Sequence, residues 1–250
     1  MCCRLLFGLC LLTLAVTGDA AEILRSGWAV ETSVQDGDQP PASYVTLFHG
    51  SLVYDVAGSG QEIAVLDTTA RHFELLDPQR RLRCLLDGTQ ILSAMAHIEM
   101  RAARIPNEFV KFAANPTFAV HFDVQRKELT LESRPIAYRV QGANLPADRL
   151  AAYLDFADWS ARLGALHPGG LPAAARIYVN RELRMRQIAP ARVSRSLRQK
   201  AQSSIAHSDH TYRETLSSEQ LIRIAEIDRQ RQAFTIVDPG QYLKPLSDPQ

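Results

Sequence analysis

The feature that most constrains the fold of this chain is a series of short segments in which apolar and polar residues alternate, with only a few residues between segments. Strict alternation places one face of a strand in the core and the other in solvent. Connections this short cannot carry the chain to a parallel neighbour, so the segments predict an antiparallel meander. Its four predicted strands are Tyr44–Val56, which includes Gly50 and Ser51, Glu62–Asp67, Arg71–Leu76 and Arg80–Leu86.

A second group of alternating segments lies beyond a predicted helix. Residues 118–124, 129–132 and 136–141 predict a second meander of three strands. An earlier strand is expected at Trp28–Val34. The helix between the two meanders begins after Asp87 and ends before Pro106, and its apolar residues recur at helical spacing: Ile91, Met95, Ile98 and Ala102.

The C-terminal part of the chain is predicted to add helices and weaker strands. Apolar residues surround most of residues 146–166, as in a helix packed between two layers. A second helix is expected at residues 173–188, and the capping-box pattern of Ser217 with Gln220 introduces a third. Weaker, more polar strands are predicted at Val193–Arg198, Ser204–Leu216 and Phe234–Val237.

These elements predict the α+β class, with a strongly curved, half-barrel-like antiparallel sheet of seven to nine strands in two meanders and helices packed on one face. Residues 21–237 are expected to form a single α+β domain. Residues 238–250 are expected to form a loose tail, because they are rich in Pro and Asp. Helices on a curved sheet leave either a filled core or a groove, and the sequence does not distinguish the two.

The first twenty residues have the organisation of an export signal. Arg4 is the only charge before the apolar run Leu5–Val16, and Gly18 and Ala20 place small side chains before a cut after Ala20. The run is shorter than the about 20 apolar residues that a membrane-spanning helix needs. We therefore expect residues 1–20 to be cleaved and the protein to be exported, periplasmic or secreted, with no transmembrane segment left. A short uncleaved anchor is the alternative.

The cysteines are divided between this signal and the rest of the chain. Three of the four lie in the signal, so only Cys84 remains and no intramolecular disulfide is possible. Cys84 alternates with Leu82 and Leu86 on the apolar side of a predicted strand. We therefore expect a buried structural thiol rather than a reactive nucleophile.

The order of two meanders separated by a helix resembles the half-open barrel of the periplasmic lipoprotein carriers. The segments Ile63–Asp67 and Phe73–Pro78 are similar to paired strands in that family, and the likeness extends in pattern from Tyr44 to Gly142. The chain also resembles uncharacterised exported bacterial proteins. The resemblance implies a curved sheet and a lipid-like ligand, and it transfers no functional residue. The carriers begin with a helix, whereas Trp28–Val34 predicts a strand here.

The densest group of metal-ligating side chains is His207, Asp209 and His210. A strand would place His210 on the face opposite to the other two, which is a poor geometry for one metal ion. An exposed polar hairpin is the alternative interpretation. We therefore assign no metal site to this segment.

Two other histidines lie on the polar sides of predicted strands. There His49 and His121 would join Asp55 or Asp123 as an acid–base pair, with solvent-facing residues as the alternative. His97 lies on the polar side of its helix. The sequence contains no nucleophile-elbow, phosphate-loop or dinucleotide motif, so we expect no cofactor and assign no catalytic residue.

Positive charge is concentrated in one segment. Between residues 176 and 200, eight cations accompany one acid, Glu182, which gives a local charge of +7 in a chain whose total is +1. Guanidinium groups pair bidentately with phosphate and carboxylate, so the segment is a candidate site for an anion or an acidic partner. A solvated face balanced by acids elsewhere is the alternative. The candidate residues are Arg176, Arg181, Arg184, Arg186, Arg192, Arg195 and Arg198.

Together these features favour an exported, non-enzymatic protein that uses the concave face of the sheet and the basic segment for binding. The expected ligand is lipid-like or otherwise amphipathic, or an anionic component of the cell envelope. Nucleic acid is not expected, because the net charge is close to zero. The alternatives are a hydrolase that uses the polar-face histidines and a structural or interaction module of the envelope.

Overall fold

The computed structural model describes residues 27–167, 173–199 and 202–243. The expected signal, residues 1–20, and Lys200 lie outside them. The described strands are β1 (Gly27–Asp36), β2 (Ala42–His49), β3 (Leu52–Ala57), β4 (Ile63–Asp67), β5 (His72–Asp77), β6 (Leu82–Asp87), β7 (Ala119–Asp123), β8 (Glu128–Glu132), β9 (Ile136–Ala143), β10 (Ala189–Gln199), β11 (Gln202–Arg213) and β12 (Thr235–Val237). The helices are α2 (Gly88–Arg104), α3 (Glu108–Ala114), α4 (Ala147–Gly164), α5 (Ala173–Arg186), α6 (Ser218–Ala233) and α7 (Pro239–Tyr242).

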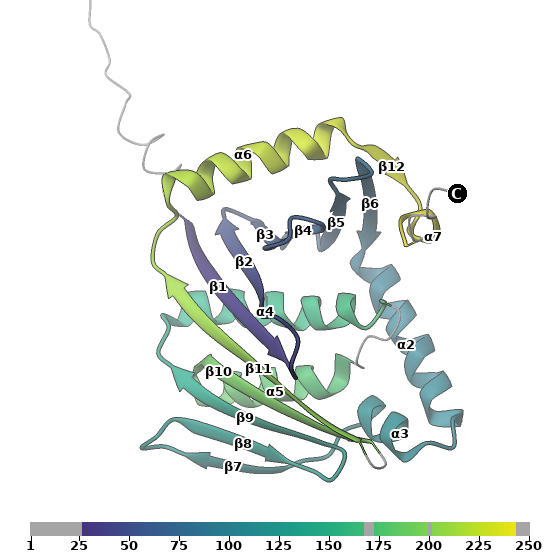
Figure 1. Cartoon of the computed structure of the whole chain (residues 1–250), viewed down its shortest axis with the longest axis vertical. Coiled ribbons are helices and arrows are strands. Elements are labelled where there is room, and N and C mark those ends of the chain that lie inside the picture. Colours follow the sequence, from purple (N-terminus) through teal and green to yellow (C-terminus); the bar gives the residue numbers. More distant parts are fainter. Residues whose placement is uncertain (1–26, 168–172, 200–201, 244–250) are drawn as a thin grey trace, which may run out of the picture.

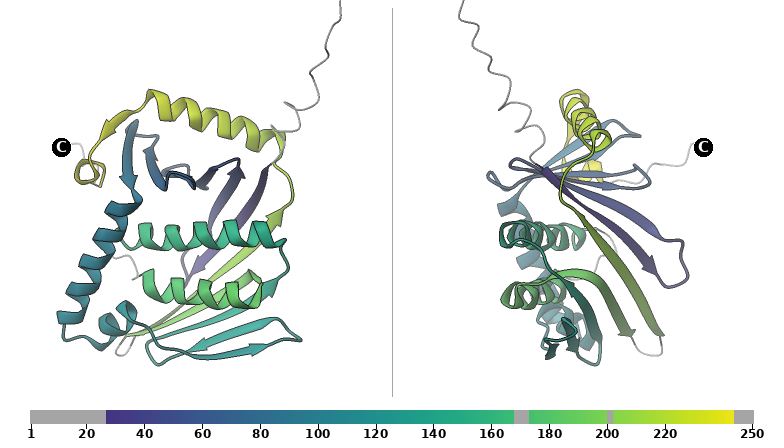
Figure 2. Two further views of the ribbon diagram at one scale, coloured as in Figure 1. Left: turned by 180° about the vertical axis from the view of Figure 1, so that it is seen from behind. Right: turned by 90° about the vertical axis from the view of Figure 1, so that its left-hand side faces the viewer.

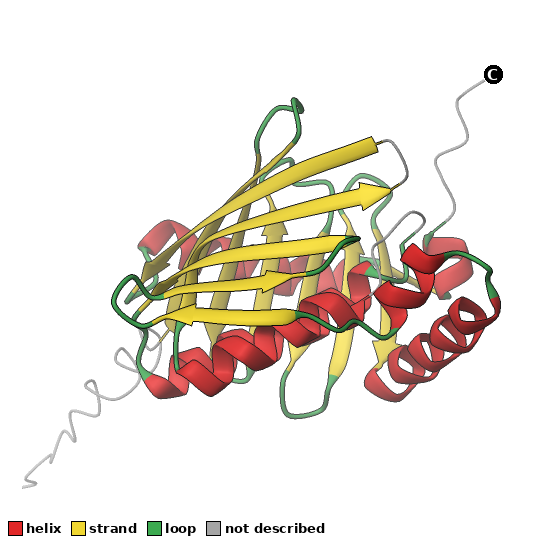
Figure 3. Cartoon of the chain, turned by 90° about the horizontal axis from the view of Figure 1, so that it is seen from below, coloured by secondary structure: helices red, strands yellow, loops and turns green. Residues whose placement is uncertain are grey.

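All twelve strands belong to one sheet, in the order β12-β6-β5-β4-β3-β2-β1-β11-β10-β9-β8-β7 (Figure 1). Neighbouring strands are antiparallel except β12, which pairs with β6 in parallel. The sheet has two edges, β12 and β7, and therefore remains open. Its curvature around the helices is visible from below in Figure 3. The predicted α+β class and curved antiparallel sheet are confirmed.

The sheet has twelve strands instead of the expected seven to nine, because the weaker predicted strands all join it and one predicted strand is a hairpin. Tyr44–Val56 divides into β2 and β3, and His49 pairs with Leu52 across a two-residue turn. Gly50 opens that turn with a φ of +60°, a conformation that glycine adopts without steric cost. The prediction that Gly50 and Ser51 lie inside a strand was therefore wrong.

The two predicted meanders are joined by the strands that the sequence marks most weakly. β10 pairs with β9, β11 pairs with β10, and β1 pairs with β11. Strands β10 and β11 are the longest of the sheet, with 11 and 12 residues. They connect the N-terminal meander to the second meander, so both belong to one continuous curved surface.

Helices α2, α4 and α5 pack on the concave face of the sheet (Figure 2). Asp87 begins α2 with the reciprocal capping box, in which its carboxylate accepts from Thr89 and its own N–H donates to Gln90. Apolar residues of α4 on several sides, among them Leu150, Leu154 and Phe156, are buried. The predicted α2, α4 and α5 are confirmed, whereas the short α3 was not predicted.

Helix α6 lies on the opposite face of the N-terminal half of the sheet (Figure 1). Ile224 and Ile227 of α6 form a second core cluster with residues of β1 to β5, including Leu47 and Ile63. The Ser217–Gln220 capping box that predicted this helix is present. Helices therefore cover both faces of the N-terminal half of the sheet. We expected all helices to pack on one face, and α6 is the exception.

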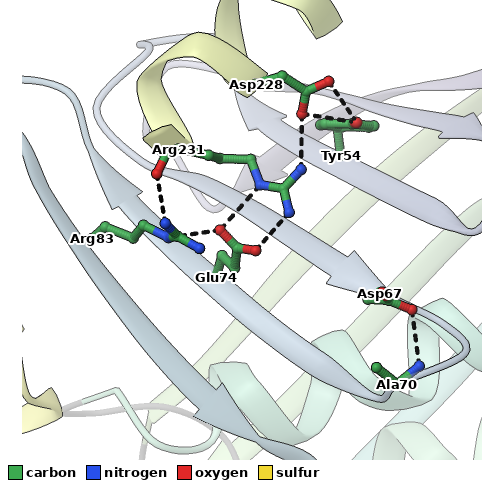
Figure 4. Close-up of polar contacts among 7 residues, drawn as sticks. All are labelled: Tyr54, Asp67, Ala70, Glu74, Arg83, Asp228 and Arg231. Carbon is green, nitrogen blue, oxygen red and sulfur yellow. Dashed lines mark hydrogen bonds and ion pairs between the residues drawn. The ribbon is translucent and has the colours of Figure 1, made fainter. Parts of the chain in front are cut away.

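A network of ion pairs ties α6 to the sheet (Figure 4). Arg231 of α6 donates twice to the Glu74 carboxylate, at 2.6 and 3.0 Å, and its third nitrogen donates to Asp228 at 2.8 Å. Tyr54 donates to Asp228 at 3.1 Å, and Arg83 pairs with Glu74 at 2.8 Å. Two cations thus balance two carboxylates, with no charge left over for a ligand.

Two further predictions concern single elements. Cys84 is completely buried, as predicted, and burial raises the pKa of its thiol. Helix α7 lies within the segment expected to be a loose tail, and its Tyr242 is buried against the core. Arg80 donates to the Tyr242 carbonyl oxygen at 2.5 Å, which fixes this helix beside β6.

Candidate functional site

Helices α2, α3 and α5 and the C-terminal part of α4 enclose a cavity of about 670 Å³. Cavities of this size are typical of small-ligand sites. We call it the helical groove. Its apolar wall consists of Leu92, Met95, Ile98, Ile105, Val110 and Ile177.

The groove exists because α2 has two apolar faces. One face carries Ile91, which is 1% exposed in the core beneath the sheet. The other carries Leu92, which is 46% exposed, and Ile105 at the end of the helix is 43% exposed. Soluble proteins rarely leave contiguous apolar surface open without a binding role. The second face of α2 is therefore a candidate contact surface for an apolar ligand.

Three arginines line the groove. Arg101 belongs to α2, Arg162 to α4 and Arg181 to α5, and one acid, Glu99, accompanies them. Arg162 lies over the Trp159 ring, 5.0 Å from its centroid. Arg181 lies 4.1 Å from the centroid of the Tyr178 ring and also pairs with Glu182 at 3.3 Å. The groove thus combines an apolar wall with excess positive charge.

A second cavity, of about 410 Å³, lies between the concave face of the sheet and helices α4 and α5. We call it the concave cavity. It is bounded by β1, β9, β10 and β11 of the sheet and by α4 and α5. Its polar lining consists of Asp36, Tyr138, Arg176, Arg195, His207 and Ser208.

A half-buried histidine adjoins the concave cavity. The Nε2 atom of His210 lies 3.0 Å from the Ser208 hydroxyl, and its Nδ1 atom lies 3.2 Å from Thr32 and 3.4 Å from the Tyr153 hydroxyl. Burial, and then the positive charge of Arg176, lower the pKa of His210 from 6.5 to about 4. The ring is therefore neutral at neutral pH.

The structure distributes the seven predicted arginines over several surfaces. Arg176 and Arg195 meet at the concave cavity, and Arg181 lines the helical groove. The others have partners or lie apart. Arg184 pairs with Asp155 and Asp158, Arg186 with Glu182, Arg192 with Asp209, and Arg198 is exposed near the end of β10.

The candidate metal ligands do not converge. His207 contacts Ser194 at 2.8 Å and Asp209 pairs with Arg192 at 2.5 Å, while His210 points to the concave side. Among the described residues, no group of three or more metal-ligating side chains is close enough to hold an ion. The description of the segment as an exposed hairpin was wrong for His210, which packs against Tyr153.

The candidate acid–base pair is also not assembled. His49 ends β2 and His121 lies on β7, and five strands separate them in the sheet. Asp55 accepts a hydrogen bond from Thr46 at 2.7 Å, and Asp123 accepts from backbone N–H groups of the following turn. His97 is exposed on α2.

Several cavity residues were missed by sequence reasoning. Leu92 and Ile105 flank the core stripe of α2, and that excess of apolar residues was the available signal for the groove. Tyr138 and Ser208 carried no signal, because each occupies an ordinary strand position and only the pairing of β9, β10 and β11 brings it to the cavity.

Searches of family models and of curated proteins found no match to this sequence. Among solved structures, the chain is similar to a LolA superfamily protein from Nitrosomonas europaea, with 9% sequence identity and a TM-score of 0.30. The similarity covers 78% of this chain and 92% of that one. Within the described residues, no helix is both long and apolar enough to cross a bilayer.

Proposed function

We propose that this protein is a non-enzymatic binding protein for an amphipathic anion, such as a fatty acid or another lipid-like molecule with one acidic group. The observation that supports it is the helical groove, in which exposed apolar side chains and three arginines line the same cavity. The apolar tail of the ligand would lie along α2, and its acidic group would face the arginines.

The apolar wall supplies the attraction for the tail. Leu92 and Ile105 are both nearly half exposed, and covering them removes apolar surface from water. Burial of apolar surface contributes about 25 cal/mol of binding free energy per Å². A ligand in this groove therefore gains affinity from surface that the fold itself leaves uncovered.

The arginines select an acidic headgroup. Arg101, Arg162 and Arg181 outnumber Glu99 in the lining, and guanidinium groups hold carboxylate or phosphate bidentately. Arg162 lies over a tryptophan ring and Arg181 over a tyrosine ring. These contacts restrict both side chains before the ligand arrives, so less conformational entropy is lost on binding.

Isothermal titration calorimetry with dodecanoate, below its micelle concentration, tests this function. We expect Leu92→Gln to weaken binding by about tenfold, because one wall contact is lost. The matched control is Leu85→Gln on β6, where a leucine of similar exposure, 44%, lies outside the groove. Absence of dodecanoate binding, or equal losses in the two variants, contradicts the proposal.

We also propose that the protein is exported. The charge and apolar run of residues 1–20 support a signal cut after Ala20. N-terminal sequencing of the protein isolated from its native cells is expected to begin at Ala21. A chain that retains Met1 would show that the segment is not cleaved.

A further inference from the structure

We propose that the concave cavity is a second and separate site, which binds an oxyanion, a carboxylate or phosphate group, between Arg176, Arg195 and the Tyr138 hydroxyl. The site goes beyond the amphiphile binding proposed for the helical groove. Apart from Ala173, the residues that line the two cavities are different.

Three elements bring these side chains together. Tyr138 of β9 is the direct cross-strand partner of Arg195 on β10, so both point from the concave face into the same space. Arg176 reaches the cavity from α5, on the opposite wall. These three side chains lie 19 to 57 residues apart in the sequence, and they meet because β10 pairs with β9 beneath α5.

The positive charge at this site is poorly compensated. Among the described residues, no carboxylate lies within ion-pair distance of Arg176. The acid nearest to Arg195 is Asp36, at 3.9 Å, and its side chain is 59% exposed. The Nε atom of Arg195 is buried and has no hydrogen-bond partner in the described part of the chain. A half-buried cation without a countercharge is costly unless an anion joins it.

The Tyr138 hydroxyl is a second and independent indication. Tyr138 is only 6% exposed, lines the cavity, and makes no hydrogen bond to any described residue. Burial raises the pKa of Tyr138, and the positive charges of Arg176 and Arg195 oppose that rise. A hydroxyl that lines the cavity and has no partner among the described residues is a free donor, and an oxyanion supplies the acceptor.

The other polar groups around Arg176 do not supply the missing negative charge. His210 is neutral at neutral pH, and burial raises the pKa of both Tyr153 and Tyr212, so these phenols are neutral as well. Ser208 contributes a hydroxyl at the cavity wall. Two arginines and one aspartate leave this site with a net charge of +1 before any ligand binds.

The size of the cavity and its mixed lining fit a headgroup or a small organic anion. Its volume of about 410 Å³ is smaller than that of the helical groove, and Val34, Val193 and Ala206 provide only a short apolar floor. Free phosphate and the phosphate headgroup of an amphiphile share the chemistry that the arginines recognise, so the test uses both.

Calorimetric titration of the purified protein with inorganic phosphate and with hexyl phosphate tests the site. We expect Arg176→Gln and Arg195→Gln each to weaken binding by about tenfold or more, and Tyr138→Phe by a few-fold. The matched control is Arg192→Gln, three residues from Arg195 on the same strand but on the other face, where it pairs with Asp209. The control is expected to bind as the wild type does.

Binding of both compounds supports a site for the free anion, and binding of hexyl phosphate alone supports a headgroup site. Binding of neither, or equal losses in Arg176→Gln and Arg192→Gln, overturns the proposal. Tyr138→Phe removes one oxygen and no charge, so it remains a usable test if an arginine variant fails to fold. Leu92→Gln should leave phosphate binding unchanged, which separates failure of this site from failure of the helical groove.

Discussion

The burial of His210 makes the stability of this protein depend on pH in a defined direction. The folded pKa of about 4 lies below the ordinary value of 6.5, so folding favours the neutral ring. The stabilisation is complete above pH 6.5 and is lost as the pH falls from 6.5 through 4, because the unfolded chain takes up a proton first. His210→Gln removes the titration while keeping a polar side chain near Thr32 and Ser208.

The magnitude follows from the difference between the two pKa values. A change of one unit corresponds to about 1.4 kcal/mol, so His210 contributes up to about 3 kcal/mol of pH-dependent stability. The half-buried ring keeps some contact with solvent, which makes this value an upper bound. His210→Gln also loses hydrogen bonds, but that loss is the same at every pH above 6.5.

The assay is urea denaturation of both proteins at several pH values between 4 and 7.5. The quantity of interest is the difference in free energy of unfolding between the wild type and His210→Gln at each pH. We expect the wild type to lose up to about 3 kcal/mol relative to the variant between pH 6.5 and 4. Titration of the imidazole by NMR gives an independent value, expected near pH 4.

Either of two results would refute this reasoning. A free-energy difference that stays constant across the range would mean that His210 does not titrate differently on folding. An NMR pKa near 6.5 would mean that the ring is accessible to water despite its contacts with Tyr153 and Thr32. Other titrating groups are present in both proteins and cancel in the difference, unless they couple directly to His210.

Two further outcomes concern charges in other parts of the fold. Burial raises the pKa of Asp55 from 3.8 to about 6 although Thr46 donates to it, so its ionisation destabilises the fold as the pH rises from 3.8 to 6. Asp55→Asn should gain up to about 3 kcal/mol over the wild type between pH 4 and 7 in urea denaturation, and a pH-independent difference would contradict this. Arg231→Met should cost up to about 3 kcal/mol, because it leaves Asp228 without its cation and removes one of the two cations that pair with Glu74. Arg231→Met combined with Glu74→Met should lose less than the sum of the two single variants, and strictly additive losses would show that this ion pair contributes nothing.

The strands of the N-terminal meander could be predicted because alternation is a local signal. Phe73 and Leu75, for example, face the concave core while Glu74 between them faces α6. The position of the β2–β3 turn could not be predicted in the same way. Gly50 and Ser51 preserve the alternation of their neighbours, and only the pairing of His49 with Leu52 shows that the chain reverses there.

The basic segment shows why a charge pattern did not predict a single site. Arg192 and Arg195 are three residues apart, which places them on opposite faces of a strand. Arg192 therefore pairs with Asp209 on the outer face, while Arg195 turns inward beside Tyr138. A run of cations that crosses from a helix into a strand is divided among several surfaces of the fold. The charge counted along the sequence is therefore larger than the charge on any single surface.

Both cavities depend on small side chains at the ends of α4 and α5, and such residues give little sequence signal. Ala161 and Gly164 of α4 line the concave cavity, Ala165 and Ala174 line the helical groove, and Ala173 lines both. Larger residues at these positions would fill the space, as Leu163 and Val179 fill the core nearby. Alanine is also the best helix former, so an alanine in a predicted helix does not by itself indicate a cavity. A cavity is defined by the volume that side chains leave empty, and that volume becomes visible only when the neighbouring elements are in place.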